Sequence, residues 1–313
     1  MSFMRNIFLI ILLFAAYSAK TQTIPELLKK AGEYYSEKKF KESLETYNKA
    51  WQKDSLNYDI YTGRGTAYYE LKEFENSFKD FTKAISIQPD SAAAYHYRAI
   101  LFYTLMYTEE AILDNTKAIE RAKNEDLLIG CFLNRGNAKQ QKRDFQGAFE
   151  DFSRAFSYDT TSIAVINNIG IVLDELGRRE EAIMYLKKAI KLDSTFVGPY
   201  VNIGFQYTLM GKYKESLEYF DKALQLEKDE PLTLNNRGFA KYNLKDYEGA
   251  FSDINKSISL YPDNSYAYKN RALVYLATGR KEEACKDLNK ARELQFEKMY
   301  GSEVNELLKK NCQ

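Results

Sequence analysis

The sequence predicts an all-α solenoid, built from eight consecutive pairs of antiparallel helices and closed at its C-terminal end by one further helix. Three observations predict it. The 313-residue chain repeats itself with a period of 34 residues. Three positions of the repeat hold only small residues. Five Pro and 15 Gly leave long helices with few breakers.

The first residues differ in composition from the rest. Ile7 to Ala16 is an unbroken apolar run, with Arg5 before it and Lys20 after it. A bilayer-spanning helix needs roughly 20 apolar residues, and a shorter apolar core behind a positive charge is typical of a secretory signal. We therefore expect residues 1–21 to be a signal peptide of an exported protein, periplasmic or secreted, of bacterial type. An uncleaved anchor is the alternative, and only then do we expect contact with a membrane.

The repeats align without gaps over long stretches. NRGNAKQQKRDFQGAFEDFSRAF at 134–156 matches NRGFAKYNLKDYEGAFSDINKSI at 236–258. A three-residue insertion, Asp126 to Leu128, separates the third repeat from the fourth. The eight repeats cover residues 24–57, 58–91, 92–125, 129–162, 163–196, 197–230, 231–264 and 265–298.

Each repeat divides into two predicted helices. Helix A covers about positions 2–14 and helix B about positions 15–28. Positions 8, 20 and 27 hold only Gly, Ala or Ser in all eight repeats, as is needed where two helix backbones approach closely. Large apolar residues such as Phe81 and Phe152 occupy position 24 between them.

This pattern resembles the tetratricopeptide repeat family, and the resemblance spans residues 24–298. It departs from the family pattern at position 4, where Trp never occurs, and at position 32, where only Pro89 and Pro262 remain. The resemblance implies a right-handed superhelix whose A helices line a concave face. Members of the family are mostly scaffolds and peptide receptors and are rarely enzymes.

Two charged positions of the repeat vary together. Position 7 is Arg and position 23 is Asp in the same five repeats, and the other three lack both. We therefore expect each Arg on helix A to contact the Asp sixteen residues later on helix B, in a structural role. Removing one partner of such a pair, if it is buried, costs about 3–5 kcal/mol. The pairs are Arg64 and Asp80, Arg98 and Asp114, Arg135 and Asp151, Arg237 and Asp253, and Arg271 and Asp287.

Helix A position 6 is Asn in five consecutive repeats. An Asn amide has both a donor and an acceptor, so a row of amides can pair with a peptide backbone of any sequence. The row resembles the asparagine ladder of the O-linked N-acetylglucosamine transferase repeat domain; solvated side chains without a ligand are the alternative. The residues are Asn134, Asn168, Asn202, Asn236 and Asn270.

Position 12 of the first three repeats is Tyr. Tyr35, Tyr69 and Tyr103 form this stripe, and Tyr97 joins it from position 6 of the third repeat. Tyr gives a large contact area with a polar tip, so the stripe is a second candidate for partner binding. Packing between neighbouring A helices is the alternative.

The C-terminal residues 299–313 predict a capping helix, Ser302 to Asn311, since a solenoid needs a cover over its last apolar face. If this helix packs like the next helix A, Cys312 at its end reaches Cys285 in the last repeat, and the two form a disulfide. Cys131 is then left as a buried thiol.

Composition excludes several function classes. Lys plus Arg is 45 and Asp plus Glu is 44. This near-zero net charge argues against binding to nucleic acid, which requires a basic face. One His and three scattered Cys do not predict a zinc site. No nucleotide-binding or catalytic motif is present, so we expect no enzyme activity and no cofactor.

The sequence favours a scaffold that binds an extended segment of a partner protein or peptide in its concave groove, in the cell envelope. Two alternatives stay open. One is an architectural subunit of an envelope complex that uses its convex or end surfaces. The other is the targeting or sensor component of a separate enzyme.

Overall fold

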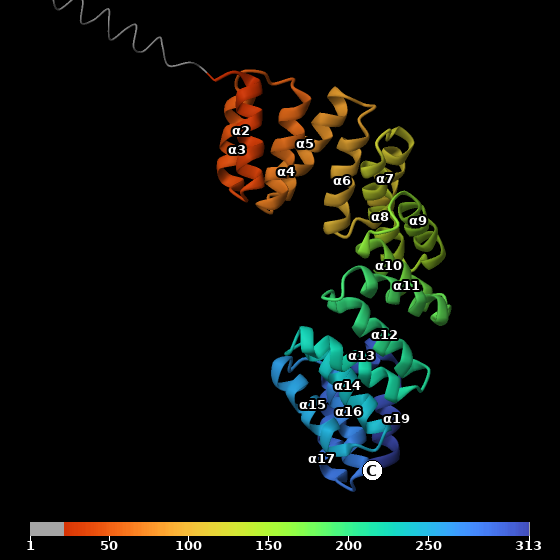
Figure 1. Cartoon of the computed structure of the whole chain (residues 1–313). Coiled ribbons are helices and arrows are strands. Elements are labelled where there is room, and N and C mark those ends of the chain that lie inside the picture. The colour runs from red at the N-terminus through yellow and green to blue at the C-terminus, as the bar shows by residue number, and fades with distance from the viewer. Residues whose placement is uncertain (1–21, 313) are drawn as a thin grey trace, which may run out of the picture. The chain divides into compact units, whose positions relative to one another are not determined.

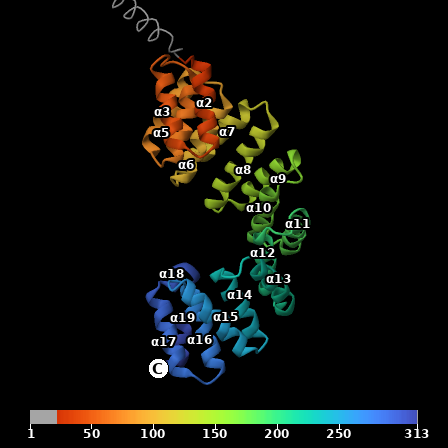
Figure 2. The same ribbon diagram turned by 60° about the vertical axis from the view of Figure 1, so that its left-hand side comes forward.

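The computed structural model describes residues 22–312, which form eighteen α-helices and no strand. The predicted signal peptide, residues 1–21, lies outside the described residues. Helices α2 to α17 form eight consecutive pairs, one for each predicted repeat, and the two helices of a pair pack side by side (Figures 1 and 2). The predicted all-α repeat architecture is confirmed.

The chain divides after Tyr158 into two compact parts. The N-terminal part contains α2 (Ile24–Ser36), α3 (Phe40–Trp51), α4 (Tyr58–Glu70), α5 (Phe74–Ile87), α6 (Ala92–Thr104), α7 (Thr108–Arg121), α8 (Glu125–Gln141) and α9 (Phe145–Tyr158). The C-terminal part contains α10 (Ile163–Glu175), α11 (Arg179–Leu192), α12 (Val197–Leu209), α13 (Tyr213–Leu226), α14 (Pro231–Asn243), α15 (Tyr247–Leu260), α16 (Ser265–Ala277), α17 (Lys281–Glu293), α18 (Phe296–Tyr300) and α19 (Glu303–Asn311).

Small residues at position 8 give helix B room to approach helix A. A Cβ added to Gly65 would lie 2.6 Å from the ring of Phe81, and one added to Gly136 would lie 2.5 Å from the ring of Phe152. Both rings are buried. The large residue at position 24 therefore packs directly against the backbone of position 8, and this contact recurs along the chain.

Position 15, between the two helices of a pair, is left-handed in all eight repeats. Gly177, Gly211 and Gly279 have φ values of 74°, 71° and 76°. Five repeats place a side chain in the same conformation, which disfavours any residue with a Cβ. These residues are Lys38, Lys72, Met106, Arg143 and Lys245.

The three-residue insertion lengthens a helix. Asn124 caps α8 by accepting a hydrogen bond from the backbone N–H of Leu127, and Glu125 and Asp126 occupy its first turn, where acidic residues are favoured. The inserted residues become an extra turn at the start of α8, which still packs on α7. The insertion therefore does not interrupt the repeats of the N-terminal part.

A C-terminal tail of two helices covers the last repeat. Helix α17 ends at Glu293, and Gln295 is left-handed, with a φ of 61°. Helix α18 then starts at Phe296, which is buried in a cluster with Ala284, Leu288 and Val304. The predicted repeat boundary at 298 therefore falls inside α18. Helix α19 packs on α17, as expected for the capping helix.

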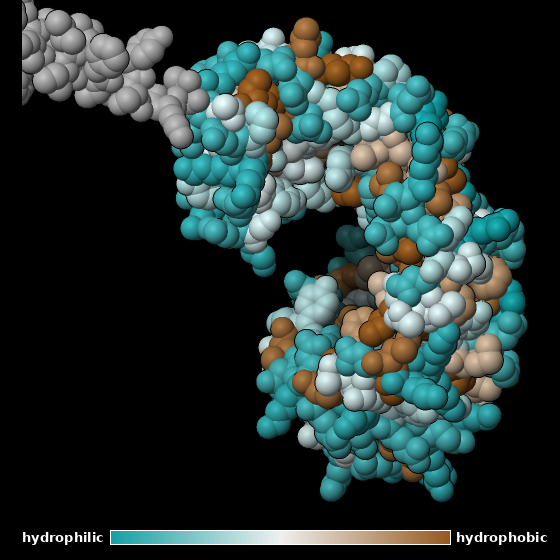
Figure 3. Space-filling model, turned by 45° about the horizontal axis from the view of Figure 1, so that its top comes forward, coloured by the Kyte–Doolittle hydropathy of each residue, from teal (hydrophilic) through white to brown (hydrophobic). Residues whose placement is uncertain are grey.

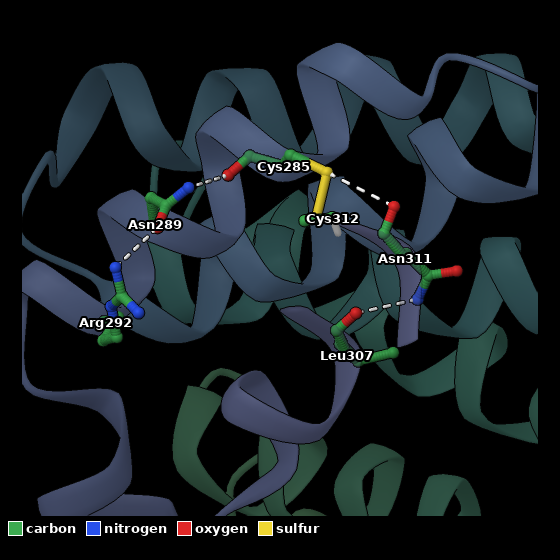
Figure 4. Close-up of a disulfide and its surroundings, with 6 residues drawn as sticks. All are labelled: Cys285, Asn289, Arg292, Leu307, Asn311 and Cys312. Carbon is green, nitrogen blue, oxygen red and sulfur yellow. Dashed lines mark hydrogen bonds between the residues drawn. A yellow bond between two sulfur atoms is a disulfide. The ribbon is translucent and has the colours of Figure 1, made fainter. Parts of the chain in front are cut away.

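A disulfide fixes the end of this tail. Cys285 on α17 and Cys312 directly after α19 are bonded, with their Cα atoms 5.7 Å apart (Figure 4). The side chain of Asn289 donates to the carbonyl of Cys285, and the side chain of Asn311 donates to that of Leu307. Cys131 is a free, buried thiol.

Candidate functional site: the A-helix face

The first helix of each pair carries the residues that the sequence singled out. We call the surface these helices present the A-helix face: α2, α4, α6 and α8 in the N-terminal part, and α10, α12, α14 and α16 in the C-terminal part. On the side of the molecule shown in Figure 3, hydrophobic residues form separate brown clusters within a mostly hydrophilic surface.

All five Arg–Asp pairs are present, and each is bidentate. In the second repeat, Arg64 donates from Nε and Nη2 to the two carboxylate oxygens of Asp80 at 2.7 and 2.8 Å. The hydrogen bonds that Arg237 donates to Asp253 and Arg271 donates to Asp287 raise the pKa of the two Arg side chains. The pairs hold helix A to helix B and are not available to a ligand.

Each of these Arg residues makes a third bond that sequence reasoning missed. Its Nη1 donates to a polar side chain on helix B of the preceding repeat, at position 25. These acceptors are Asn48, Thr82, Thr116, Asp221 and Asn255, at 2.7 to 3.2 Å. Position 25 is polar in all eight repeats, including Ser153 and Lys187 before the two repeats that have Ile at position 7, so polarity alone could not identify these bonds.

The tyrosine stripe joins neighbouring A helices. The Tyr35 hydroxyl donates to Glu70 at 3.2 Å, and the Tyr69 hydroxyl lies 2.8 Å from Oγ1 of Thr104. Both tyrosines, and Tyr103, are half-buried. Tyr35 and Tyr69 therefore brace adjacent repeats, although part of each ring stays accessible.

The row of amides is not uniform. Asn134 lies in the N-terminal part and the other four in the C-terminal part, where Asn202 donates to Asn167 at 3.2 Å and Asn270 donates to Asn235 at 3.0 Å. Asn270 is 1% exposed. It braces α16 against α14 and is not part of an open groove, which corrects its assignment to the partner-binding set. The remaining members of the row are half-buried.

Two neighbouring cavities open on the A-helix face of the C-terminal part. The first, of about 290 Å³, is lined by Phe205, Leu232, Asn235, Asn236, Asn264, Tyr266 and Tyr300. The second, of about 560 Å³, shares Leu232 and is lined mainly by apolar residues of the α12 N-terminal region, with Asn202, Glu227 and Glu230. Phe205 and Leu232 are 40% and 50% exposed, so large apolar side chains stand open to solvent at both.

One polar group in the first cavity lacks a partner. Asn264 is 7% exposed, and its Oδ1 caps α16 by accepting from the backbone N–H of Tyr266. Its Nδ2 is buried and makes no hydrogen bond to any described residue. An unsatisfied buried donor costs about 1–3 kcal/mol, and an acceptor brought by a ligand would relieve that cost.

The tail contributes to this cavity. Tyr300 of α18 packs edge-on against Tyr266 and is itself 53% exposed. Lys269 is 2% exposed, its Nζ lies 3.2 Å from Glu303 of α19, and burial lowers its pKa. The positive charge of Lys269 is therefore paired with a carboxylate of the tail.

A buried Cys–His–Asn cluster in the N-terminal part does not form a nucleophile. Nδ1 of His96 lies 3.1 Å from Oδ1 of Asn115 and 3.4 Å from Sγ of Cys131. Burial raises the pKa of Cys131 to about 12 and lowers the pKa of His96. Both groups are neutral near pH 7, so the thiolate that such chemistry requires is not formed.

Residues 22–312 contain no group of three or more His, Cys, Asp and Glu side chains placed to hold a metal ion. Within the same residues, no helix has the length and apolar character needed to cross a bilayer.

Comparisons with known proteins agree with the repeat pattern. Two family models described as tetratricopeptide repeat match the chain: one at residues 58–91, 163–196, 197–230 and 233–264, the other at residues 254–286. No curated protein sequence matches.

Solved structures share the fold. The crystal structure of the APC/C hetero-tetramer Cut9-Hcn1 contains a chain that is 19% identical, with a TM-score of 0.65; the match covers 92% of the present chain and 55% of the other. The present chain thus spans about half the length of that relative. A structure from the functional characterisation of Pseudomonas aeruginosa pilF is 22% identical, with a TM-score of 0.59, and the match covers 70% and 98% of the two chains.

Proposed function

The chain is a tetratricopeptide repeat protein, and from this premise we propose that it is a scaffold that binds an extended segment of a partner protein on the A-helix face of its C-terminal part. The observation that carries the proposal is the pair of cavities that meet at Leu232. Such repeats generally serve protein interaction and not catalysis.

The chemistry of the cavities suits a peptide. Exposed Phe205 and Leu232 supply apolar area, and the half-buried amide of Asn236 supplies a donor and an acceptor beside them. The unpartnered Nδ2 of Asn264 offers a further donor to a peptide carbonyl. Apolar pockets with a few fixed polar groups are the usual composition of a binding site.

A photo-crosslinking experiment tests this proposal. Benzoylphenylalanine replaces Phe205 in one full-length variant and Met184 in another; Met184 lies on α11 and is 60% exposed. We expect a discrete partner to be captured from Phe205 and not from Met184. Capture from Met184 alone would favour the architectural alternative, and a separate enzyme captured at either position would favour the sensor alternative.

Affinity measurements with the captured partner then test the cavity. The triple variant Phe205→Ser, Leu232→Ser, Asn236→Ala should bind at least about tenfold more weakly, since apolar contacts and a hydrogen bond are lost together. The matched control Met184→Ser should bind normally. Unchanged affinity of the triple variant would refute binding at this face.

We also propose that the protein works outside the reducing cytosol. The Cys285–Cys312 disulfide supports this, because structural disulfides persist in oxidising compartments, and so does the apolar run Ile7 to Ala16. Mass spectrometry of the protein from its own cells should find a new N-terminus near Thr21. An intact N-terminus in the cytosolic fraction would contradict the proposal.

A further inference from the structure

A separate cavity of about 330 Å³ lies on the A-helix face of the N-terminal part. Three tyrosines, one carboxylate and two hydroxyls surround it. They are Tyr35 of α2, Tyr47 of α3, Asp59, Thr62 and Thr66 of α4, and Tyr97 of α6. Four helices from three successive repeats thus converge on one small volume, within the range of ligand pockets.

Tyr47 reaches this cavity because position 6 of the second repeat is Gly63. A Cβ at Gly63 would lie 2.3 Å from the Tyr47 ring, so any larger residue there would displace the ring. Tyr47 is 8% exposed as a residue, so packing fixes most of its ring, and the part that lines the cavity supplies an aromatic wall.

The charge of the cavity is unbalanced. Asp59 is exposed and forms no ion pair with another residue of 22–312, and no basic residue is among those that line the cavity. Burial, together with Glu70, raises the pKa of Tyr35 to about 12, and burial and Asp59 raise the pKa of Tyr47. The phenols are therefore neutral near pH 7, and the Asp59 carboxylate leaves the cavity with one negative charge.

We propose that this cavity binds an organic cation, an ammonium or guanidinium group, held by the tyrosine rings and by the Asp59 carboxylate. Aromatic faces carry negative electrostatic potential and attract cations, more strongly where water is excluded. The hydroxyls of Tyr47, Thr62 and Thr66 can accept hydrogen bonds from a cation that carries N–H groups, whereas a quaternary ammonium group would be held by the rings and the carboxylate alone. This cavity lies in the N-terminal part, whereas the proposed peptide cavities lie in the C-terminal part. A negative result for one proposal therefore does not contradict the other.

Two pairs of probes test the proposal on the full-length chain. N-acetyl-arginine amide is compared with N-acetyl-citrulline amide, its neutral isostere, and choline is compared with neutral 3,3-dimethylbutan-1-ol. Binding is followed by NMR of ¹³C-labelled tyrosine rings. We expect the cation of at least one pair to shift the signals of Tyr47 and Tyr97, with affinity about tenfold or more above its neutral isostere.

The responding pair identifies the source of the cation, a partner's side chain for the arginine probe or a free quaternary amine for choline. Asp59→Asn should weaken the responding probe about tenfold, whereas Asp126→Asn, a control on an exposed carboxylate of α8, should not. Equal binding of cation and isostere in both pairs, or an Asp59→Asn variant that melts and binds like the wild type, would overturn the proposal.

Discussion

Arg98 and Asp114 face each other across the third repeat, joined by hydrogen bonds of 2.6 Å from Nε to Oδ2 and 3.0 Å from Nη2 to Oδ1. The carboxylate side chain is 3% exposed and the Arg side chain 16%. Little water therefore reaches the pair, and each charge is stabilised mainly by its partner and not by solvent.

This dependence predicts strong non-additivity. Arg98→Ile or Asp114→Tyr alone should cost about 3 kcal/mol of unfolding free energy, because each leaves a buried charge unpaired. The double variant should lose less than the sum by at least about 1 kcal/mol, since the fifth and sixth repeats carry Ile and Tyr at these positions. Denaturant unfolding of the four proteins measures the difference, and strictly additive losses would contradict the pairing.

The left-handed residues predict a stabilising substitution. Lys72 holds φ at 61° between α4 and α5, where the fifth, sixth and eighth repeats have Gly. Lys72→Gly should raise stability by up to about 1 kcal/mol, because Gly avoids the steric cost of this conformation. Thermal melting checks this, with Gly211→Lys as the reverse change and an expected loss. A lower melting temperature for Lys72→Gly would show that the strain is absent.

His96 predicts a pH dependence of stability. Burial lowers its pKa in the folded protein, so the unfolded chain binds a proton first as the pH falls. Stability is therefore unaffected above the unfolded pKa of about 6.5 and falls below it, by up to about 1 kcal/mol by about pH 5.5. His96 is the only His in the chain, so His96→Gln should remove this change. Identical pH profiles for both proteins would refute it.

The disulfide predicts a local effect of reduction. Cys285→Ser should speed hydrogen exchange of the amides of α19, because the bond closes the segment of 27 residues that carries the tail. Loosening α19 should also free Lys269 from Glu303 and expose it to amine-reactive reagents. Cys131→Ser serves as the control and should leave exchange in α19 unchanged. Equal protection of α19 in the reduced and oxidised proteins would show that packing alone holds it.

Periodicity explains why so much of the fold could be predicted. The helix pairs, the small residues opposite Phe81 and Phe152, and the Arg–Asp partners each recur in several repeats. A single sequence therefore supplies several independent copies of the same contact. Arg at position 7 and Asp at position 23 occur in the same repeats and are absent from the same repeats. This covariation within one chain indicates contact without the sequence of a related protein.

Features that occur once could not be found in this way. Asn270 occupies the same repeat position as Asn236, yet it is 1% exposed and donates to Asn235 of α14. Tyr300 enters a cavity from outside the repeats. The cavity around Tyr47 depends on Gly63. This residue also occupies position 6, but it was not singled out because the prediction considered only the Asn residues at that position.

The third hydrogen bond of each Arg affects how the chain unfolds. An Arg that is bonded within its own repeat and also to the preceding repeat stabilises the interface between those two neighbours in a linear array of repeats. Within the N-terminal part all three junctions carry this link, through Arg64, Arg98 and Arg135. In the C-terminal part the junction between the fifth and sixth repeats has none, because position 7 is Ile203. The first four repeats should thus melt as one cooperative block, whereas the fifth should fray from its neighbour at lower temperature.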